Sequence, residues 1–545
     1  MISLSNSLCH LWGKISKQVK TAFIAATVIG LLAHITFLTN RFFNHDSILY
    51  TLIDPNSTFF LQQGKWLSLF MNRIVQGDIT TSGIIVPIAL LFLGLTASFT
   101  VSILKIKSPV WSAVTGGFLV LFPSVACANV YESSAVFFSA LLLSAIAVYV
   151  TIRWKYGFIA GVALLTLSFG VYSVFSGYAA GLFLLYLIFS LISGDTSVKD
   201  ALVKGLKYLA VLAISALLYY IILQLLLRIQ HVSLMDYRGI DNIGKFSISS
   251  ISTVLYESYR KVYYFFYYGI FLYRGYFEIE PIFRYLNWLS IGLTLFFCGC
   301  VLIKKGIIKD IGRTVLIVLL VVIFPLAIHA IAILGQNAYT HWIMCYPFVL
   351  VYVALLASVD SFEEIYVMKD GTKAYSNKVK FIFKSSTILT LVIATLLCRQ
   401  WFFTTNQAYE YIRYQNQNAI AKGIMFTNDI QNDEEYNANV PIAFVGDGGP
   451  IAFQYQTNDF LVIHGEDGIG YTGFNGAIID SDRLKKLLTN WIGIDFKYCN
   501  TELVTALTTN SVVIDMPIYP SRGSIKLIDG VLVVKLSDIQ IKQNK

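Results

Sequence analysis

Residues 83–104 read GIIVPIALLFLGLTASFTVSIL, a run of 22 residues without a charged side chain, and Lys105 and Lys107 follow it. A helix rises about 1.5 Å per residue, so such a run can cross the ~30 Å hydrocarbon layer of a bilayer. Comparable runs recur throughout the chain, which has 545 residues and is 56% hydrophobic. We predict eleven membrane-spanning segments, at 21–39, 83–104, 109–127, 134–152, 157–174, 177–193, 205–227, 285–303, 312–334, 342–358 and 382–399. The expected fold is therefore an α-helical polytopic membrane protein.

The loops between these segments alternate in charge. Every second loop is basic, with lysines and arginines such as Lys105, Arg153 and Lys305, whereas the short loops 128–133, 175–176 and 335–341 have no Lys or Arg. The positive-inside rule then puts the N-terminus in the cytoplasm. The loops at about 40–82, 128–133 and 228–284, together with the C-terminal region, are expected on the outer side.

Hydropathy drops after Arg399, which predicts a membrane domain at 1–399 and a soluble C-terminal domain at 400–545. The first part holds 30 basic and 16 acidic residues and the second 11 and 16, and an acidic tail argues against nucleic acid as a partner. Helical periodicity is expected at 407–430 and 484–492, short strands at 441–445, 460–464 and 511–515, and a hairpin at 525–536 that turns at Asp529-Gly530. A small α/β extracytoplasmic domain fits this pattern.

Acidic residues are absent from the apolar segments and concentrate on the loops. Asp46 lies just beyond the first segment, where a carboxylate can deprotonate an acceptor hydroxyl near the lipid phosphates. Glu132 is the single charged residue of the tight loop 128–133. A solvated loop or cap for Asp46, and a favourable helix dipole for Glu132, remain the structural alternatives. Together they predict surface chemistry rather than transport through the bilayer.

A leaving phosphate needs positive charge, and several basic residues are expected on the outer side beside aromatic, interfacial sequence. These candidates are Lys65, Arg73, Arg260, Lys261, Arg274, Arg284 and His341. The run at 263–268 is expected in a helix lying in the headgroup layer. No metal-ligand spacing occurs and no metal site is predicted, although a role for a divalent cation stays open.

These residues also resemble a known family. Asp46-Ser47 after the first segment, Gly64-Lys65-Trp66, Phe122-Pro123 followed by Tyr131-Glu132, and the run Leu167–Ser173 are similar to motifs of the type II glucosyltransferases, the serotype-converting enzymes of O-antigen modification. The chain departs from the family in having Asp46-Ser47 for two adjacent acids, Lys65 for Arg, and Tyr172-Ser173 for Tyr-Gln.

The resemblance implies a C-type (GT-C-like) glycosyltransferase in the bacterial inner membrane. Its donor would be glucose on undecaprenyl phosphate, and its acceptor a sugar of the lipopolysaccharide O-antigen at the periplasmic face. Asp46 would act as base in an inverting reaction with Glu132 as its partner, while Trp66, Tyr131 and Tyr172 would contact sugar. Membrane lipids, a lipid-sugar flippase and a polyprenyl-phosphate glucosyltransferase would be its working partners.

Three alternatives remain open on the sequence. Another polyprenyl-phosphate-sugar transferase would share this face and differ only in its acceptor. An O-antigen polymerase would use arginines on large outer loops, and the 228–284 loop has several. A polysaccharide flippase would need a charged track through the bilayer, which the segments do not supply.

Overall fold

The computed structural model describes residues 13–44, 46–49, 57–77, 81–235, 251–271, 276–278, 281–331, 341–367, 377–446 and 480–538. The chain divides into two compact units. Unit 1 comprises residues 1–39 and 54–406, and unit 2 comprises residues 40–53 and 407–545. The 55-residue helix α17 (Asn377–Gln431) contributes its first part to unit 1 and its last part to unit 2.

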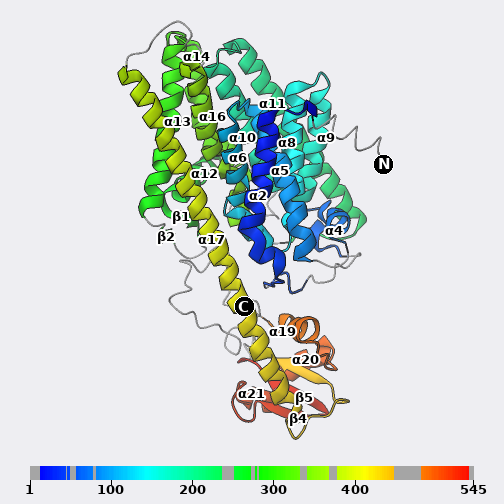
Figure 1. Ribbon diagram of the computed structural model, residues 1–545. Coiled ribbons are helices and arrows are strands. Elements are labelled where there is room, and N and C mark those ends of the chain that lie inside the picture. Colours follow the sequence, from blue (N-terminus) through cyan, green and yellow to red (C-terminus); the bar gives the residue numbers. More distant parts are fainter. Residues whose placement is uncertain are drawn as a thin grey trace, which may run out of the picture. The chain divides into compact units, whose positions relative to one another are not determined.

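Unit 1 is a helical bundle (Figure 1). Among the described residues, ten stretches are long and apolar enough to cross a membrane, which confirms the predicted polytopic helical fold. The helices are α2 (Lys17–Thr39), α3 (Phe59–Gln62), α4 (Ser68–Gln76), α5 (Ser82–Leu104), α6 (Pro109–Leu121), α7 (Ser124–Val130), α8 (Ser134–Arg153), α9 (Gly157–Tyr172), α10 (Ser176–Ile192), α11 (Val198–Ile229), α12 (Ile251–Tyr268), α13 (Pro281–Lys304), α14 (Ile311–Ile328) and α16 (Val349–Val367). Short 3₁₀ segments are η1 (Ser173–Phe175), η4 (Ile307–Lys309) and η5 (Trp342–Phe348), and β1 (Gly269–Phe271) pairs antiparallel with β2 (Tyr276–Glu278).

Small residues bring the first helices together. The buried residues of α2 include Ala22, Ala26, Gly30 and Ala33, which recur at helical spacing. A Cβ added at Gly116 of α6 would lie 2.4 Å from the carbonyl oxygen of Ala22, so only glycine permits this backbone approach. Close contact through small side chains is the usual way in which helices pack in a bilayer, where water does not drive association.

One of the ten stretches, Gly157–Ile192, contains two helices. α9 begins beside Thr151, whose hydroxyl donates to Gly157 O over 3.2 Å. α10 ends beside Ser193, whose carbonyl oxygen accepts Lys305 Nζ over 2.7 Å. Both ends therefore lie among the basic loops, and the chain reverses at η1, where the two predicted segments were separated.

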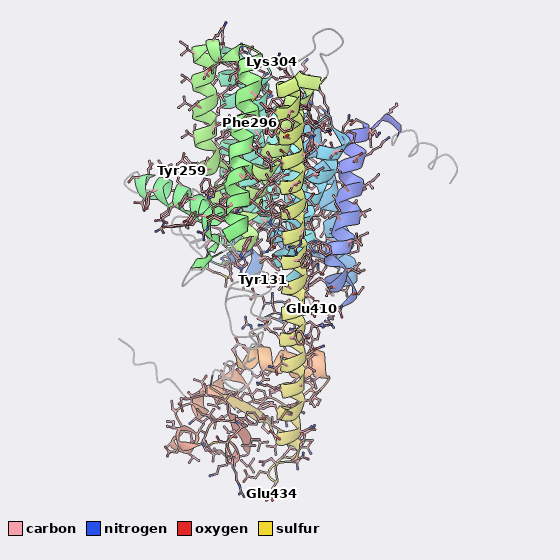
Figure 2. The ribbon with its side chains drawn as sticks, turned by 60° about the vertical axis from the view of Figure 1, so that its left-hand side comes forward. Tyr131, Tyr259, Phe296, Lys304, Glu410 and Glu434 are labelled. Carbon is pink, nitrogen blue, oxygen red and sulfur yellow. The ribbon has the colours of Figure 1, made fainter. Side chains whose placement is uncertain are left out.

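The basic loops meet at one end of unit 1, here called the basic end and defined by Lys105, Lys107, Arg153, Lys207 and Lys305. Lys105 pairs with Asp195 over 3.1 Å, Lys107 pairs with Glu364, and Lys207 Nζ donates to Thr151 O over 3.0 Å. Figure 2 labels Lys304 near this end and Tyr131 toward the other. The described residues 57–77 and 128–133, which belong to loops predicted on the outer side, lie at this opposite end.

Unit 2 contains a three-stranded sheet of order β3-β5-β4, built from β3 (Ile442–Val445), β4 (Ile525–Ile528) and β5 (Val531–Lys535). β3 is parallel to β5, and β4 and β5 form the predicted hairpin, which turns at Asp529-Gly530, both with positive φ. The remaining elements are α19 (Ser481–Leu487), the π-helical η7 (Leu488–Ile492), α20 (Thr501–Leu507) and α21 (Ser511–Asp515).

One of the strands predicted for unit 2 is a helix in the structure. Residues 511–515 are helical rather than extended, because Asn510 caps the segment and its side chain accepts the N–H of Val512. A cap of this kind outweighs the β preference of Val512 and Val513. The strand predicted at 460–464 lies outside the described residues.

Candidate functional site

The segment 57–77 connects α2 to α5 at the opposite end of unit 1 and docks on α9 and α11. Leu67 N donates to Gly170 O over 2.8 Å, and Ser68 Oγ donates to Val171 O over 2.6 Å. Tyr219 of α11 donates its hydroxyl to Gly64 O over 2.8 Å. These bonds fix the turn that presents Lys65 and Trp66.

Trp66 explains why a glycine occupies position 170. A Cβ added there would lie 2.4 Å from the Trp66 ring, so the indole packs directly on the α9 backbone. The predicted sugar-contacting residues Trp66 and Tyr172 are thereby brought to the same place. The sequence could not indicate that Trp66 and Tyr172 lie close together, because more than 100 positions separate them.

Lys65 lies over a pair of stacked aromatic rings. Its Nζ is 5.4 Å from the centroid of Tyr172 and 5.7 Å from that of Phe137, whose rings stack at 4.2 Å. Lys65 Nζ also donates to Gln63 Oε1 over 2.9 Å. Cation–π contacts of this kind hold an ammonium group in place without removing its charge.

Glu132 adopts a backbone conformation that L residues rarely take. Its φ is +52°, and only 6% of the residue is exposed. Its N–H donates to Asn129 O over 2.7 Å, and its carbonyl oxygen accepts Gln76 Nε2 over 3.0 Å. A left-handed conformation costs about 1–3 kcal/mol for a non-glycine residue, so a carboxyl side chain is kept here at the expense of stability.

Tyr131 and His341 form a second polar group beside Glu132. His341 Nδ1 accepts the N–H of Ile343 over 3.3 Å, which leaves the proton of the neutral ring on Nε2. Nε2 is 3.3 Å from the Tyr131 hydroxyl, so the imidazole donates to the phenol oxygen. The Cys127 thiol lies 3.9 Å from Nδ1.

The remaining basic candidates are spread over several elements. Burial lowers the pKa of Lys261 on α12, and the neighbouring charge of Arg260 lowers it further. Arg260 pairs with Glu257 over 2.7 Å, and Arg284 lies over the Tyr267 ring at 4.3 Å. Arg73 is exposed on α4, and Arg274 lies outside the described residues. The predicted helix at 263–268 is confirmed as the last part of α12, whose buried face includes Ser258, Val262 and Phe265.

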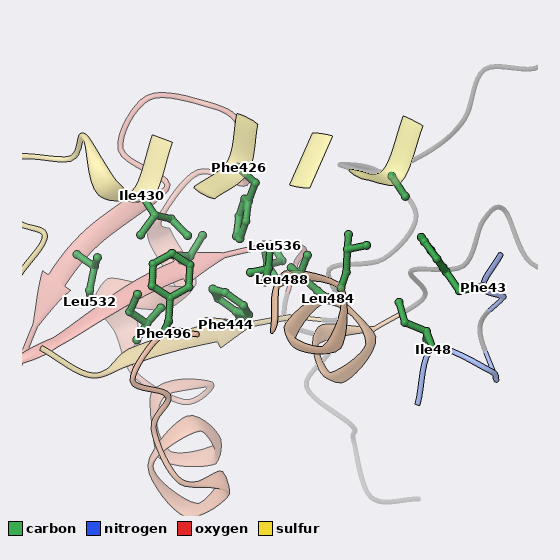
Figure 3. Close-up of a cluster of buried hydrophobic side chains, with 14 residues drawn as sticks. Phe43, Ile48, Phe426, Ile430, Phe444, Leu484, Leu488, Phe496, Leu532 and Leu536 are labelled. Carbon is green, nitrogen blue, oxygen red and sulfur yellow. The ribbon is translucent and has the colours of Figure 1, made fainter. Parts of the chain in front are cut away.

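Asp46 belongs to unit 2, which corrects its assignment to the membrane domain. Phe43 and Ile48 are buried in the hydrophobic core of unit 2 with Leu484, Leu488 and other residues (Figure 3). The sequence contained no signal for this packing, because the partners of residues 40–49 follow more than 360 positions later. Burial of these two large apolar side chains stabilises the segment within unit 2.

Hydrogen bonds hold the Asp46 turn in a single form. Asn416 Oδ1 accepts Phe43 N over 2.8 Å, and Asn416 Nδ2 donates to Phe43 O over 2.7 Å. Asn44 Oδ1 accepts the N–H groups of Asp46 and Ser47, each over 2.8 Å. Asn416 was missed by the sequence reasoning, since one amide within a long helical pattern gives no sign of such a role.

The Asp46 carboxylate remains accessible. Its side chain is 35% exposed, and its Oδ1 lies 3.8 Å from Nη2 of Arg483. Arg483 also pairs with Asp480, whose side chain caps α19. Asp46 and Glu132 thus belong to different units, while Lys65, Trp66, Tyr131, Glu132, Tyr172 and His341 all belong to unit 1.

The described residues contain no group of three or more His, Cys, Asp or Glu arranged to hold a metal ion. The opposite end of unit 1 contains a buried carboxyl group, basic side chains and aromatic rings. This set can accept a proton, stabilise a phosphate and contact a sugar ring.

Comparison with known protein families gives a match. The sequence model of a family described as glucosyl transferase GtrII matches residues 35–357, which is more than half of the chain. No curated protein and no solved structure matches. The matched range includes every candidate residue from Asp46 to His341, and the chain therefore belongs to the glucosyl transferase GtrII family.

Proposed function

We propose that this glucosyltransferase moves glucose from undecaprenyl phosphate to a sugar of the lipopolysaccharide O-antigen at the periplasmic face of the bacterial inner membrane. The family supports sugar transfer. The gathering of the basic loops at the other end of unit 1 supports a periplasmic site, because basic loops favour the cytoplasm. A flippase and a polyprenyl-phosphate glucosyltransferase would supply the donor.

The reaction we propose inverts the anomeric centre. A carboxylate takes the proton of the acceptor hydroxyl, the hydroxyl oxygen forms a bond to C1 of glucose, and the bond between C1 and the phosphate oxygen breaks. The phosphate leaves with the electron pair. Asp46 is the proposed base, and Glu132 positions the acceptor.

Lys65, Lys261 and His341 are proposed to stabilise the charge that develops on the departing phosphate. Lys65 is held over two aromatic rings, and His341 presents Nε2–H toward Tyr131. Positive charge fixed in place before the reaction costs no reorganisation when the phosphate leaves.

The observation that carries the proposal is the conformation of Glu132. A buried glutamate on a left-handed backbone carries strain that a glycine would avoid. Gln76 donates to the carbonyl oxygen of Glu132 and so joins this turn to the segment that carries Lys65, which supports a role for the carboxyl group in positioning the acceptor.

Unit 2, which carries Asp46, is proposed to bind the polymeric acceptor. Because Phe43 and Ile48 are packed in its core, deleting residues 407–545 would also remove the support of Asp46. Point substitutions separate the chemistry of Asp46 from its support. Asp46→Asn removes only the carboxylate, whereas Trp491→Ala removes a ring whose centroid lies 4.4 Å from that of Phe43 and so loosens the segment that carries Asp46.

The test is sugar transfer in membranes that contain the wild type or Asp46→Asn at equal expression. The substrates are radiolabelled polyprenyl-phosphate glucose and lipopolysaccharide, and label is followed into polysaccharide. Label with the wild type and its loss with Asp46→Asn supports the reaction and the base. Full activity of Asp46→Asn would leave the reaction intact and transfer the role of base to Glu132.

The acceptor is tested in the same assay. Label that enters protein, lipid A or teichoic acid instead of O-antigen would indicate a different polyprenyl-phosphate transferase. Absence of transfer, with lengthening of unlabelled O-antigen chains, would indicate a polymerase.

A further inference from the structure

Two polar atoms beside Glu132 are buried and make no hydrogen bond within the part of the chain that the structure describes. They are Oε1 of Gln76, a residue 4% exposed, and Oγ of Ser134, a residue 0% exposed. Leaving a buried polar group without a partner costs about 1–3 kcal/mol, and folded proteins contain few such groups. Two of them at one place need an explanation.

Both atoms belong to the same small region. Gln76 Nε2 donates to Glu132 O over 3.0 Å, so Oε1 of the same amide lies next to that turn. Ser134 follows two residues after Glu132 and is the first residue of α8. Trp66 Nε1, on the segment that ends with Gln76, is a third buried polar atom without a partner in the described structure.

Several other buried hydroxyl groups of the bundle are satisfied locally. Ser112 donates to Ser108 O over 2.8 Å, Thr166 donates to Val162 O over 2.8 Å, and Ser139 donates to Val136 O over 2.6 Å. The fold therefore has a simple means of satisfying a hydroxyl, and Ser134 does not use it. An alanine at the start of α8 would avoid the cost altogether.

We propose that Gln76 Oε1 and Ser134 Oγ form a hydroxyl-binding subsite for a hexose, in which sugar hydroxyls supply the missing hydrogen bonds. The inference rests on the proposed function and adds residues that the sequence did not indicate. Gln76 Oε1 can accept from a sugar hydroxyl, Ser134 Oγ can donate or accept, and Trp66 Nε1 can donate. The sugar comes either from the donor lipid or from the acceptor polymer.

The test uses purified full-length protein and measures binding as well as turnover. The donor arm compares affinity for polyprenyl-phosphate glucose with affinity for bare polyprenyl phosphate, and the acceptor arm measures affinity for free O-antigen polysaccharide. Ser134→Ala should weaken one of these sugar-dependent affinities by about 5- to 10-fold, the cost of one hydrogen bond, without changing the affinity for bare polyprenyl phosphate. Ser139→Ala is the matched control, because it removes a buried hydroxyl of the same helix that is already satisfied.

Deoxy sugars identify the hydroxyl that is recognised. Wild type should lose affinity with one monodeoxy glucose donor, or one deoxy acceptor, and Ser134→Ala should show no further loss with that analogue. Gln76→Met, which removes the acceptor oxygen, should lose this selectivity.

The melting temperature distinguishes a sugar-binding role of Ser134 from a structural role. Ser134→Ala removes an unsatisfied group, so the melting temperature of the unliganded protein should stay the same or rise. A lower melting temperature with unchanged sugar affinities in both arms would overturn the subsite. Sugar affinity that depends on Ser134, without transfer by the wild type, would preserve the subsite and refute the proposed reaction.

Discussion

At the basic end of unit 1 the Asp360 carboxylate accepts two backbone N–H groups, whereas at the opposite end Gln76 Oε1 and Ser134 Oγ have no partner in the described structure. The N–H groups belong to Lys107 and Ser108, over 2.8 and 2.7 Å, and Glu363 accepts Trp111 Nε1 over 3.0 Å. These polar groups at the basic end hold α6 against α16. At the opposite end, Gln76 and Ser134 keep unsatisfied atoms beside the strained backbone of Glu132, the pattern expected where a ligand completes the site.

Among the variants of unit 1, the largest effect should come from removing the carboxyl group of Glu132. Glu132→Gln is expected to lower transfer by about 10²-fold, because the acceptor hydroxyl loses the group that positions it. Glu364→Gln, which breaks an exposed ion pair at the basic end, is the matched control and should stay near wild type. Both are measured as initial rates in membranes at equal expression.

Glu132→Gly tests whether the strained backbone at this position is kept for the sake of the carboxyl group. It should raise stability by about 1 kcal/mol through relief of the left-handed conformation, while activity is lost. A variant that is both more stable and fully active would show that the carboxyl group has no chemical role.

Asp360→Ala should weaken the packing of α6 against α16 at the basic end. It removes the acceptor of two N–H groups, which costs about 3 kcal/mol of unfolding free energy for two bonds to a charged group. Thermal unfolding in detergent measures this loss, while activity per folded molecule should remain. A large fall in turnover of the folded protein would contradict the separation between the two ends.

Lys65→Met should lower transfer by about 10- to 100-fold, because the charge over Tyr172 and Phe137 is removed while the packing is kept. Lys65→Arg should recover most of the activity, since it restores the charge. Equal activity of the Met and Arg variants would show that Lys65 only packs against the rings.

Asn416→Ala tests the support of Asp46 within unit 2. Loss of the two bonds to Phe43 should destabilise unit 2 by about 1–2 kcal/mol and lower turnover several-fold. Limited proteolysis after Asn40 and the transfer assay measure the two effects. Thr427→Ala, which removes a hydroxyl bonded within α17, provides the control.

The smallest effect should be a pH dependence from Lys261. Burial lowers its pKa, so its charge is present below that lowered value and is lost as the pH rises through it. Donor affinity should therefore fall a few-fold at a pH below the ordinary lysine value of about 10.4. Lys261→Arg should abolish this alkaline limb, because a guanidinium stays charged. An unchanged profile in that variant would exclude Lys261 from phosphate binding.

The helices of unit 1 could be predicted from sequence because each depends on a local property, a run of apolar residues long enough for a bilayer. The alternation of basic and neutral loops likewise predicted which loops would meet at one end. The hairpin at Asp529-Gly530 was also local and was confirmed. The helix at 511–515 was missed because the Asn510 cap competes with the β propensity of its valines.

The candidate site was only partly predictable. Sequence indicated Glu132 as a lone acid in a tight loop, but it could not indicate its left-handed conformation or its bond to Gln76. Ser134 and Gln76 are ordinary polar residues until the fold buries them without partners. Asn416 became relevant only when Phe43 was placed beside it.

The sequence by itself determined the number and apolar length of the membrane segments, the charge alternation of their loops and the family motifs, because these properties are local along the chain. Tertiary structure alone decided that residues 40–53 fold with residues 407–545, that Trp66 packs on Gly170, and that Gln76 meets Glu132. The physical reason is that burial and hydrogen-bond partners are set by packing between segments far apart in sequence. A residue's own identity does not determine which atoms surround it.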